Sequence, residues 1–216
     1  MRGYLVKPVG DGPFPAVLVI HENRGLNPHI EDVARRAAID GFLALAPDGL
    51  APAGGYPGDD DDDDDDDDGK QLQRSLDRGK LHVNFFNSAR FLKSHALSNG
   101  KLGTTGFCWG GSTVNYLAVE MGGDLHAAVP FYGAAPKSGI DRIKAPLLVQ
   151  YAENDGRNNA MRQGFEAAPQ RRPGQARLAA HDRVLQGEFG VDTNGIQPSS
   201  RHPRAVRDAD LLRLRP

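Results

Sequence analysis

The chain has 216 residues, a formal net charge of −2 and one cysteine, Cys108. This length is enough for one substantial domain with a buried core. A single cysteine excludes an internal disulfide and a paired-cysteine metal site, and it fits a reducing compartment. The first 20 residues contain no apolar run long enough for a signal peptide or a membrane span. We therefore expect a cytoplasmic protein, unless a start codon further upstream encodes a leader.

An unbroken run of ten aspartates, 59–68, dominates the charge. Removing these ten from the formal charge of −2 leaves +8, and much of that surplus lies in the C-terminal tail. The balance therefore does not indicate a nucleic-acid surface, and we expect neither nucleic acid nor a membrane as a partner. Like charges repel, so we expect a disordered, solvated loop over 59–68. A multi-carboxylate metal site is the less favoured alternative, because metal-binding loops space their ligands with glycine and apolar residues.

The first half of the chain alternates between strand and helix patterns. Residues 15–20, "PAVLVI", form a short apolar run that is typical of a buried strand. Residues 29–41 carry apolar side chains at helical spacing and end at a glycine. Residues 42–49 predict a second buried strand, and 80–97 predict an amphipathic helix after the acidic run.

The same alternation continues up to about residue 168. We expect strands at 101–107, 126–133 and 145–152, and helices at 111–121 and about 159–168. Strands alternating with helices indicate right-handed β-α-β units. The predicted fold class is therefore α/β, with a mostly parallel sheet covered by helices on both faces.

The segment from 169 to 216 differs from the rest of the chain. It contains nine arginines, no lysine and one aromatic residue, Phe189. Its only strand-like stretch is 176–185, and 204–215 is compatible with a helix. We therefore divide the chain into a core over 1–168 and an atypical Arg- and Pro-rich tail.

The stretch "GFCWGG" at 106–111 places Cys108 between a predicted strand and a predicted helix. This is the G-x-nucleophile-x-G pattern, in which small neighbours allow a strained turn to lift the side chain to the sheet edge. The positive end of the helix dipole favours the reactive thiolate there. A buried structural cysteine is the alternative, but the glycines and the strand–turn–helix setting favour a nucleophile.

Glu22 follows the first predicted buried strand, so we expect it at the same sheet edge as Cys108. An exposed loop carboxylate is the alternative reading. The backbone N–H groups of Asn23 and Trp109 could together form an oxyanion hole. His21 is adjacent to Glu22, which is weak evidence that the two side chains pair.

A nucleophile of this kind needs an acid and a base later in the chain. Asp155 follows the strand predicted at 145–152 and is a better candidate than Glu153, which lies closer to that strand. His202 and His181 are the remaining candidates for the base. His202 fits better, because His181 falls inside the one strand-like stretch of the tail. Each is also typical of a surface histidine.

The chain closely resembles the dienelactone hydrolase family of α/β-hydrolases, also called carboxymethylenebutenolidase-like proteins. The matching stretches are "PAVLVIHENRGLNPHIEDVARRAAIDGFLALAPDGL", "SNGKLGTTGFCWGG" with "NYLAV", and "IKAPLLVQYAEND". The resemblance implies an α/β-hydrolase fold with a Cys-Asp-His triad, no metal or organic cofactor, and a lactone or activated ester as substrate. It assigns Cys108 as the nucleophile, Asp155 as the acid and Glu22 as a glutamate that contacts the thiol.

The resemblance fails at the base. Family members carry a "YPG…HGF"-like segment about thirty residues after the aspartate, where this chain has "VLQGEFG" with Gln186 and no histidine. One hypothesis is that the tail is a high-GC gene read in another frame. Without the family histidine, release of the acyl group should be slow, so we expect low turnover through Cys108. The alternatives are a non-catalytic relic that binds ligands, and, more weakly, a redox-sensing thiol.

Overall fold

The computed structural model describes residues 2–58, 65–151, 154–156 and 210–213. Its strands are β1 (Arg2–Val6), β2 (Phe14–Ile20), β3 (Leu43–Asp48), β4 (Ser98–Phe107), β5 (Ala127–Phe131) and β6 (Asp210–Arg213). Its helices are α1 (Pro28–Ile39), α2 (Asp65–Ser75), α3 (Arg78–Lys93) and α4 (Trp109–Met121). Three short 3₁₀ turns are η1 (Ala51–Ala53), η2 (Gly122–Asp124) and η3 (Ile140–Arg142).

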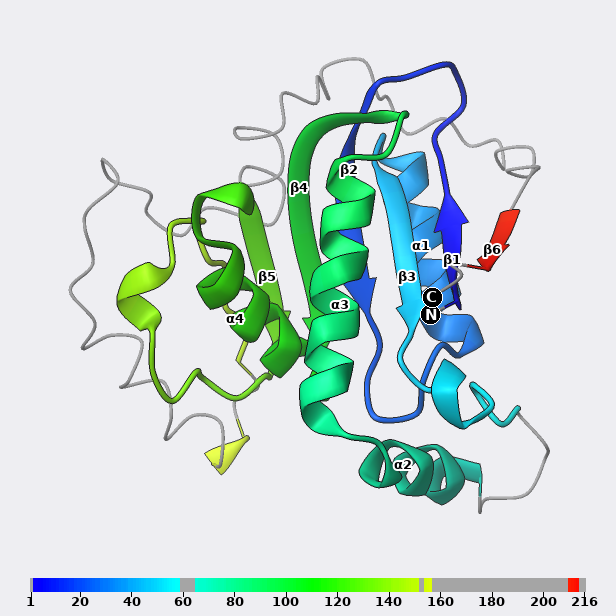
Figure 1. Cartoon of the computed structure of the whole chain (residues 1–216), viewed down its shortest axis with the longest axis vertical. Helices are drawn as coiled ribbons and strands as arrows, with labels where there is room; N and C mark the ends of the chain where they lie inside the picture. The colour runs from blue at the N-terminus through cyan, green and yellow to red at the C-terminus, as the bar shows by residue number, and fades with distance from the viewer. Residues whose placement is uncertain (1, 59–64, 152–153, 157–209, 214–216) are drawn as a thin grey trace.

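The strands form one mixed sheet in the order β5-β4-β2-β3-β1-β6 (Figure 1). β2 pairs in parallel with both β3 and β4, and β4 pairs in parallel with β5. β1 runs antiparallel to β3, and β6 runs antiparallel to β1. The carboxyl ends of the four parallel strands therefore meet at one edge of the sheet, which is where open α/β sheets hold their sites.

Helices cover both faces of this sheet, with α3 and α4 on one face and α1 on the other (Figure 1). The alternating direction of the side chains of β2 explains why both faces of the sheet are covered. Leu18 and Ile20 belong to the core beneath α3 and α4, whereas Val17 and Val19 belong to the core beneath α1. Successive strand side chains point to opposite faces, so a strand buried on both sides is apolar throughout. The predicted α/β class is confirmed.

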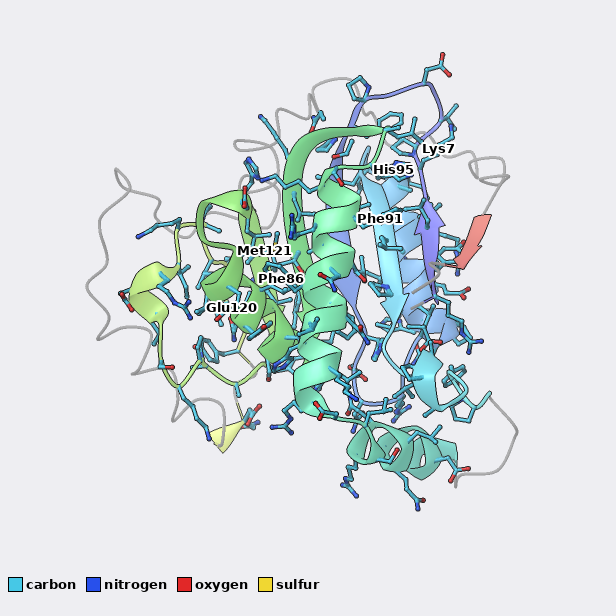
Figure 2. The ribbon with its side chains drawn as sticks, viewed as in Figure 1. Lys7, Phe86, Phe91, His95, Glu120 and Met121 are labelled. Atoms are coloured by element: carbon cyan, nitrogen blue, oxygen red, sulfur yellow. The ribbon has the colours of Figure 1, made fainter. Side chains whose placement is uncertain are left out.

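The core beneath α3 and α4 is rich in aromatic residues. Phe85 of α3 is fully buried there, and Phe86 and Phe91 of the same helix pack against the cluster. Met121, the last residue of α4, is also buried in it (Figure 2). This packing fixes α4 against the sheet and so fixes the turn from which α4 begins.

Most predicted elements of the first 131 residues are present. The helix predicted at 29–41 is α1, capped by the Asn27 side chain, which accepts the Ile30 N–H. It ends just before Gly41, which has a φ of 95°. The predicted strands at 15–20, 42–49, 101–107 and 126–133 are β2 to β5, with ends that shift by up to three residues. β1 was not expected, because its five residues alternate too briefly to give a clear pattern.

The acidic run is in part helical. Asp65–Ser75 form α2, so the expectation of a disordered loop over 59–68 is wrong for its last four residues. Residues 59–64 lie outside the described part of the chain.

Two further expectations need correction. The segment predicted as a strand at 145–152 forms isolated parallel bridges to β5, at Leu147 and Gln150, rather than a continuous strand. Its backbone still extends the sheet, since the Tyr132 N–H donates to the Gln150 carbonyl over 2.8 Å. Within the stretch 204–215, which is compatible with a helix, Asp210–Arg213 instead form β6. Pairing with the exposed edge of β1 overrides the local helical pattern. The helix predicted at 159–168 lies outside the described residues.

Candidate active site

Cys108 lies on the turn between β4 and α4. It is exposed, and its backbone has φ 53° and ψ −112°. Its N–H donates to the Phe131 carbonyl over 3.0 Å, and its own carbonyl accepts the Ser112 N–H. The thiol therefore lies at the N-terminus of α4, at the carboxyl edge of the parallel strands. This is the strand–turn–helix geometry that the sequence predicts.

The glycines around Cys108 are required by close backbone contacts. A Cβ atom at Gly106 would lie 2.8 Å from the backbone of Gly110. A Cβ atom at Gly110 would lie 2.4 Å from the Ile20 carbonyl oxygen. Neither contact is tolerated by a side chain, so α4 packs this closely on β2 and β4 only because both positions are glycine.

Tyr132 is a further site residue, which was not expected from the sequence. It follows β5, and its hydroxyl donates to Glu22 Oε1 over 2.7 Å. Burial raises the pKa of Tyr132, and the Glu22 carboxylate and the charge of Cys108 raise it further. The phenol therefore stays protonated and remains a donor. A tyrosine directly after a buried strand, at the same edge as Cys108, was the available signal.

Backbone strain is concentrated at this point. Among the described residues, Cys108 and Tyr132 are the only non-glycine residues with positive φ, at 53° and 38°. Such conformations cost about 1–3 kcal/mol each and persist only where the surrounding structure imposes them. Their occurrence together, next to Glu22, marks this edge as the candidate site.

His21 is fully buried, and both of its ring nitrogens contact the protein backbone. Its Nε2 accepts the Gly49 N–H over 2.9 Å, and its Nδ1 lies 2.5 Å from the Glu22 carbonyl oxygen. Burial lowers the pKa of His21, although the nearby carboxylates of Asp48 and Glu22 oppose the shift. With both ring nitrogens occupied by the backbone, His21 is not available as a general base in this conformation. It also does not pair with the Glu22 side chain.

The two amides expected to form the oxyanion hole lie at the ends of neighbouring strands. Asn23 follows β2, and Trp109 is the first residue of α4. Neither N–H donates to an acceptor within the part of the chain that the structure describes. The Trp109 ring stacks on His21 at 5.9 Å and meets Phe85 edge-on at 5.5 Å.

The other predicted site residues are placed only in part. Asp155 is half-buried and follows the segment that extends the sheet beside β5. It therefore comes from the same edge as Cys108 and Glu22. Glu153, His181 and His202 lie outside the described residues.

The described residues contain no group of three or more His, Cys, Asp or Glu side chains arranged to hold a metal ion. Nor do they include a helix whose length and apolar character would let it cross a membrane. Two surface grooves are present, one along the start of α3 near Leu76 and Lys80, the other between Phe91 and Met121. Neither is lined by Cys108, so neither defines a substrate pocket at the thiol.

Comparison with known proteins places this geometry in a family. The family model described as "Dienelactone hydrolase family" matches residues 1–185. A protein of Yersinia pestis provisionally named carboxymethylenebutenolidase is 32% identical over 96% of this chain and 79% of its own length. A provisionally named hydrolase fragment of Escherichia coli, YghX, is 60% identical over 78 residues, which are 36% of this chain and 62% of that protein.

Solved structures agree with the sequence relatives. The crystal structure of a provisionally identified dienelactone hydrolase from Klebsiella pneumoniae superposes with a TM-score of 0.63 at 30% identity. The superposition covers 77% of this chain and 75% of that one. A dienelactone hydrolase-like promiscuous phosphotriesterase, P91, superposes with a TM-score of 0.57 at 27% identity, over 72% and 66% of the two chains. The chain belongs to the dienelactone hydrolase family, whose members are hydrolases of the α/β-hydrolase fold.

Proposed function

We propose that this chain cleaves a lactone or another activated ester through the thiolate of Cys108. The observation that carries the proposal is the exposed thiol on a strained turn, at the N-terminus of α4 and beside the Tyr132–Glu22 pair. A helix N-terminus stabilises the thiolate, which is the nucleophilic form of cysteine. Relatives named carboxymethylenebutenolidase support a lactone as the substrate class.

In the proposed reaction, the Cys108 sulfur bonds to the carbonyl carbon of the ester. The Asn23 and Trp109 amides hold the resulting oxyanion. The ester C–O bond then breaks, and the leaving oxygen takes a proton. Water cleaves the thioester, which releases the acid and regenerates the thiol. No step requires a metal or an organic cofactor.

The second half of this cycle needs a base to activate water. In the family pattern a histidine oriented by Asp155 has this role, but the expected position holds Gln186. His202 and His181 are the candidates that remain, and His202 is the preferred one. We therefore propose that acylation of Cys108 is fast and that release of the acid is slow.

A time course with an activated aryl ester tests the proposal. We expect a burst of about one equivalent of the aryl alcohol followed by near arrest, because the acyl-enzyme accumulates. Intact mass should show the acyl group on Cys108, and Cys108→Ala should remove both the burst and the adduct. Sustained turnover that His202→Ala abolishes would instead assign the base to His202. A wild-type chain with no burst would overturn the proposal and favour a non-catalytic relic.

A further inference from the structure

The His21 ring bridges two backbone segments that lead out of neighbouring strands. Its Nε2 accepts the N–H of Gly49, which follows β3, over 2.9 Å. A neutral imidazole has one acceptor nitrogen and one N–H, so a ring whose Nε2 accepts must carry its proton on Nδ1. Nδ1 lies 2.5 Å from the Glu22 carbonyl oxygen, after β2, and donates to it. Two contacts thus define one tautomer.

The carbonyl that His21 holds belongs to the same peptide unit as the Asn23 N–H. Cis peptide bonds in the described residues are confined to Gly12–Pro13, so the Glu22–Asn23 peptide is trans. In a trans peptide the C=O and N–H point in opposite directions across one rigid plane. Fixing the Glu22 carbonyl toward the buried ring therefore aims the Asn23 N–H away from that ring, out of the core.

The turn on the Gly49 side of this bridge is held by further hydrogen bonds. Asp48 is buried, its Oδ1 accepts the Leu50 N–H over 3.0 Å, and its Oδ2 accepts from Arg2 Nε over 2.8 Å. These bonds shape the turn that presents the Gly49 N–H. A Cβ atom at Gly49 would lie 2.8 Å from His21 Nε2, so glycine is needed for the ring to approach.

The His21 ring also contacts the second oxyanion residue. It stacks on Trp109 at 5.9 Å with an interplanar angle of 20°, and Phe85 meets both rings edge-on, His21 at 5.7 Å and Trp109 at 5.5 Å. One buried ring therefore contacts the Trp109 ring and the carbonyl of the peptide that carries the Asn23 N–H. Preorganised donors of this kind stabilise a transition state because they need no rearrangement when charge develops.

We infer that His21 is a positioning residue, which fixes the Glu22–Asn23 peptide so that the Asn23 N–H serves as an oxyanion donor to a carbonyl attacked by Cys108. The inference rests on the proposed function, since it concerns the same acylation step. The hydrogen bond that His21 gives to the Glu22 carbonyl also polarises the peptide and strengthens its N–H as a donor.

Two substitutions separate the two hydrogen bonds of the ring. His21→Asn places an amide near the position of Nδ1 and keeps a donor for the Glu22 carbonyl. His21→Gln reaches the position of Nε2 and keeps an acceptor for the Gly49 N–H. His95→Gln is the control, because it makes the same change in another histidine that bonds a backbone N–H, that of Leu97, but at the opposite end of the sheet (Figure 2).

Two reactions of Cys108 separate oxyanion binding from thiolate reactivity. Acylation by an activated aryl ester develops an oxyanion, whereas alkylation by iodoacetamide displaces iodide at a saturated carbon and develops none. We expect His21→Gln to slow acylation at least about tenfold and to change alkylation less than about threefold. His21→Asn should acylate within about threefold of wild type, and His95→Gln should match wild type in both reactions.

Several outcomes would overturn the inference. One is equal acylation by wild type and His21→Gln, and another is an equal loss of acylation and alkylation, which indicates a merely structural role. If His21→Gln does not fold, slow acylation by a folded His21→Asn overturns it.

Nitrogen NMR of His21 in the wild-type chain is a readout that needs no activity. It should show the proton on Nδ1, and a proton on Nε2 would contradict the inference even if the ester burst is absent. Failure of the proposed function appears instead as a wild-type chain with no burst, so the two failures are distinguishable.

Discussion

At the residue scale, the site depends on two side chains held in costly backbone conformations. Cys108 and Tyr132 both have positive φ, and the Cys108 N–H is bonded to the carbonyl of Phe131, which directly precedes Tyr132. One hydrogen bond therefore links the backbones of the two strained residues. Tyr132 then donates to Glu22, 110 positions earlier in the chain. Strain and hydrogen bonding together fix where the Glu22 carboxylate lies relative to the thiol turn.

The candidate site was predictable from the sequence only where its signal is local. Cys108 stands in a recognisable glycine pattern, and Glu22 directly follows an apolar run. The roles of Tyr132 and His21 depend on partners that only the fold brings together, such as Gly49 for the His21 ring. The sequence contains no local pattern for such long-range pairs.

His21 should make the fold sensitive to mild acid. Burial lowers its pKa in the folded chain from an ordinary value of 6.5, and the hydrogen bond to the Glu22 backbone and the charges of Asp48 and Glu22 oppose that shift only in part. The unfolded chain therefore binds a proton at His21 before the folded chain does. This contribution to stability is complete above pH 6.5 and is lost as the pH falls through 6.5 toward the lowered value.

Urea unfolding of wild type and His21→Gln at pH 7, 6 and 5 measures this effect. As the pH falls, the free energy of unfolding should decrease more steeply for wild type than for His21→Gln, by up to about 1.4 kcal/mol per pH unit. His82→Gln is the comparison, because burial also lowers the pKa of His82 but that ring is only half-buried. His82→Gln should reduce the pH dependence of the free energy of unfolding by less than His21→Gln does. Parallel curves for wild type and His21→Gln would refute the assignment.

At the element scale, the apolar strands and amphipathic helices were predictable because each buries a face with a regular period. β2, β3 and α1 agree with their predicted ranges within a residue or two. The errors lie where pairing with distant elements decides the conformation. β1 and Asp210–Arg213 form strands through their antiparallel pairing at the edge of the sheet, which no short window of sequence contains.

The packing of α4 on β2 gives a sharp test at this scale. Gly110→Ala would place its Cβ 2.4 Å from the Ile20 carbonyl oxygen and 2.5 Å from that of His21. Both obstacles are backbone atoms, so α4 must move away from the sheet. We expect a loss of about 1–3 kcal/mol in the free energy of unfolding. The alkylation rate of Cys108 should also fall, because the turn that carries the thiol moves with the helix.

Gly123→Ala is the matched control for that substitution. A Cβ atom at Gly123 meets no atom within 4 Å, so we expect a change within about 0.5 kcal/mol. Urea unfolding and iodoacetamide alkylation of both variants supply the measurements. Equal stability of the two variants would show that α4 does not pack against β2 as closely as the structure has it.

At the scale of the whole molecule, the family match ends next to the position where the family histidine is missing. The family model extends to residue 185, beyond the boundary at 168 expected from composition. The resemblance places the family histidine next to that end, where the chain has Gln186. The hypothesis that the tail is read in another frame remains a prediction. An "HGF"-like segment in another frame of the gene would support it, and an uninterrupted transcript with a matching intact mass would contradict it.

The C-terminal strand allows a last test, because it lies at the edge of the sheet, away from the candidate site. β6 pairs with β1, with Leu212 opposite Gly3, on the opposite side of β3 from the strands that carry Cys108 and Glu22. A chain ending at residue 209 leaves the β1 edge unpaired, whereas a chain ending at 213 keeps the pairing. We expect faster amide hydrogen exchange at residues 3–5 of the shorter chain and an unchanged ester burst. Equal exchange in the two chains would show that β6 does not hold β1, and a lost burst would show that the edge supports the site.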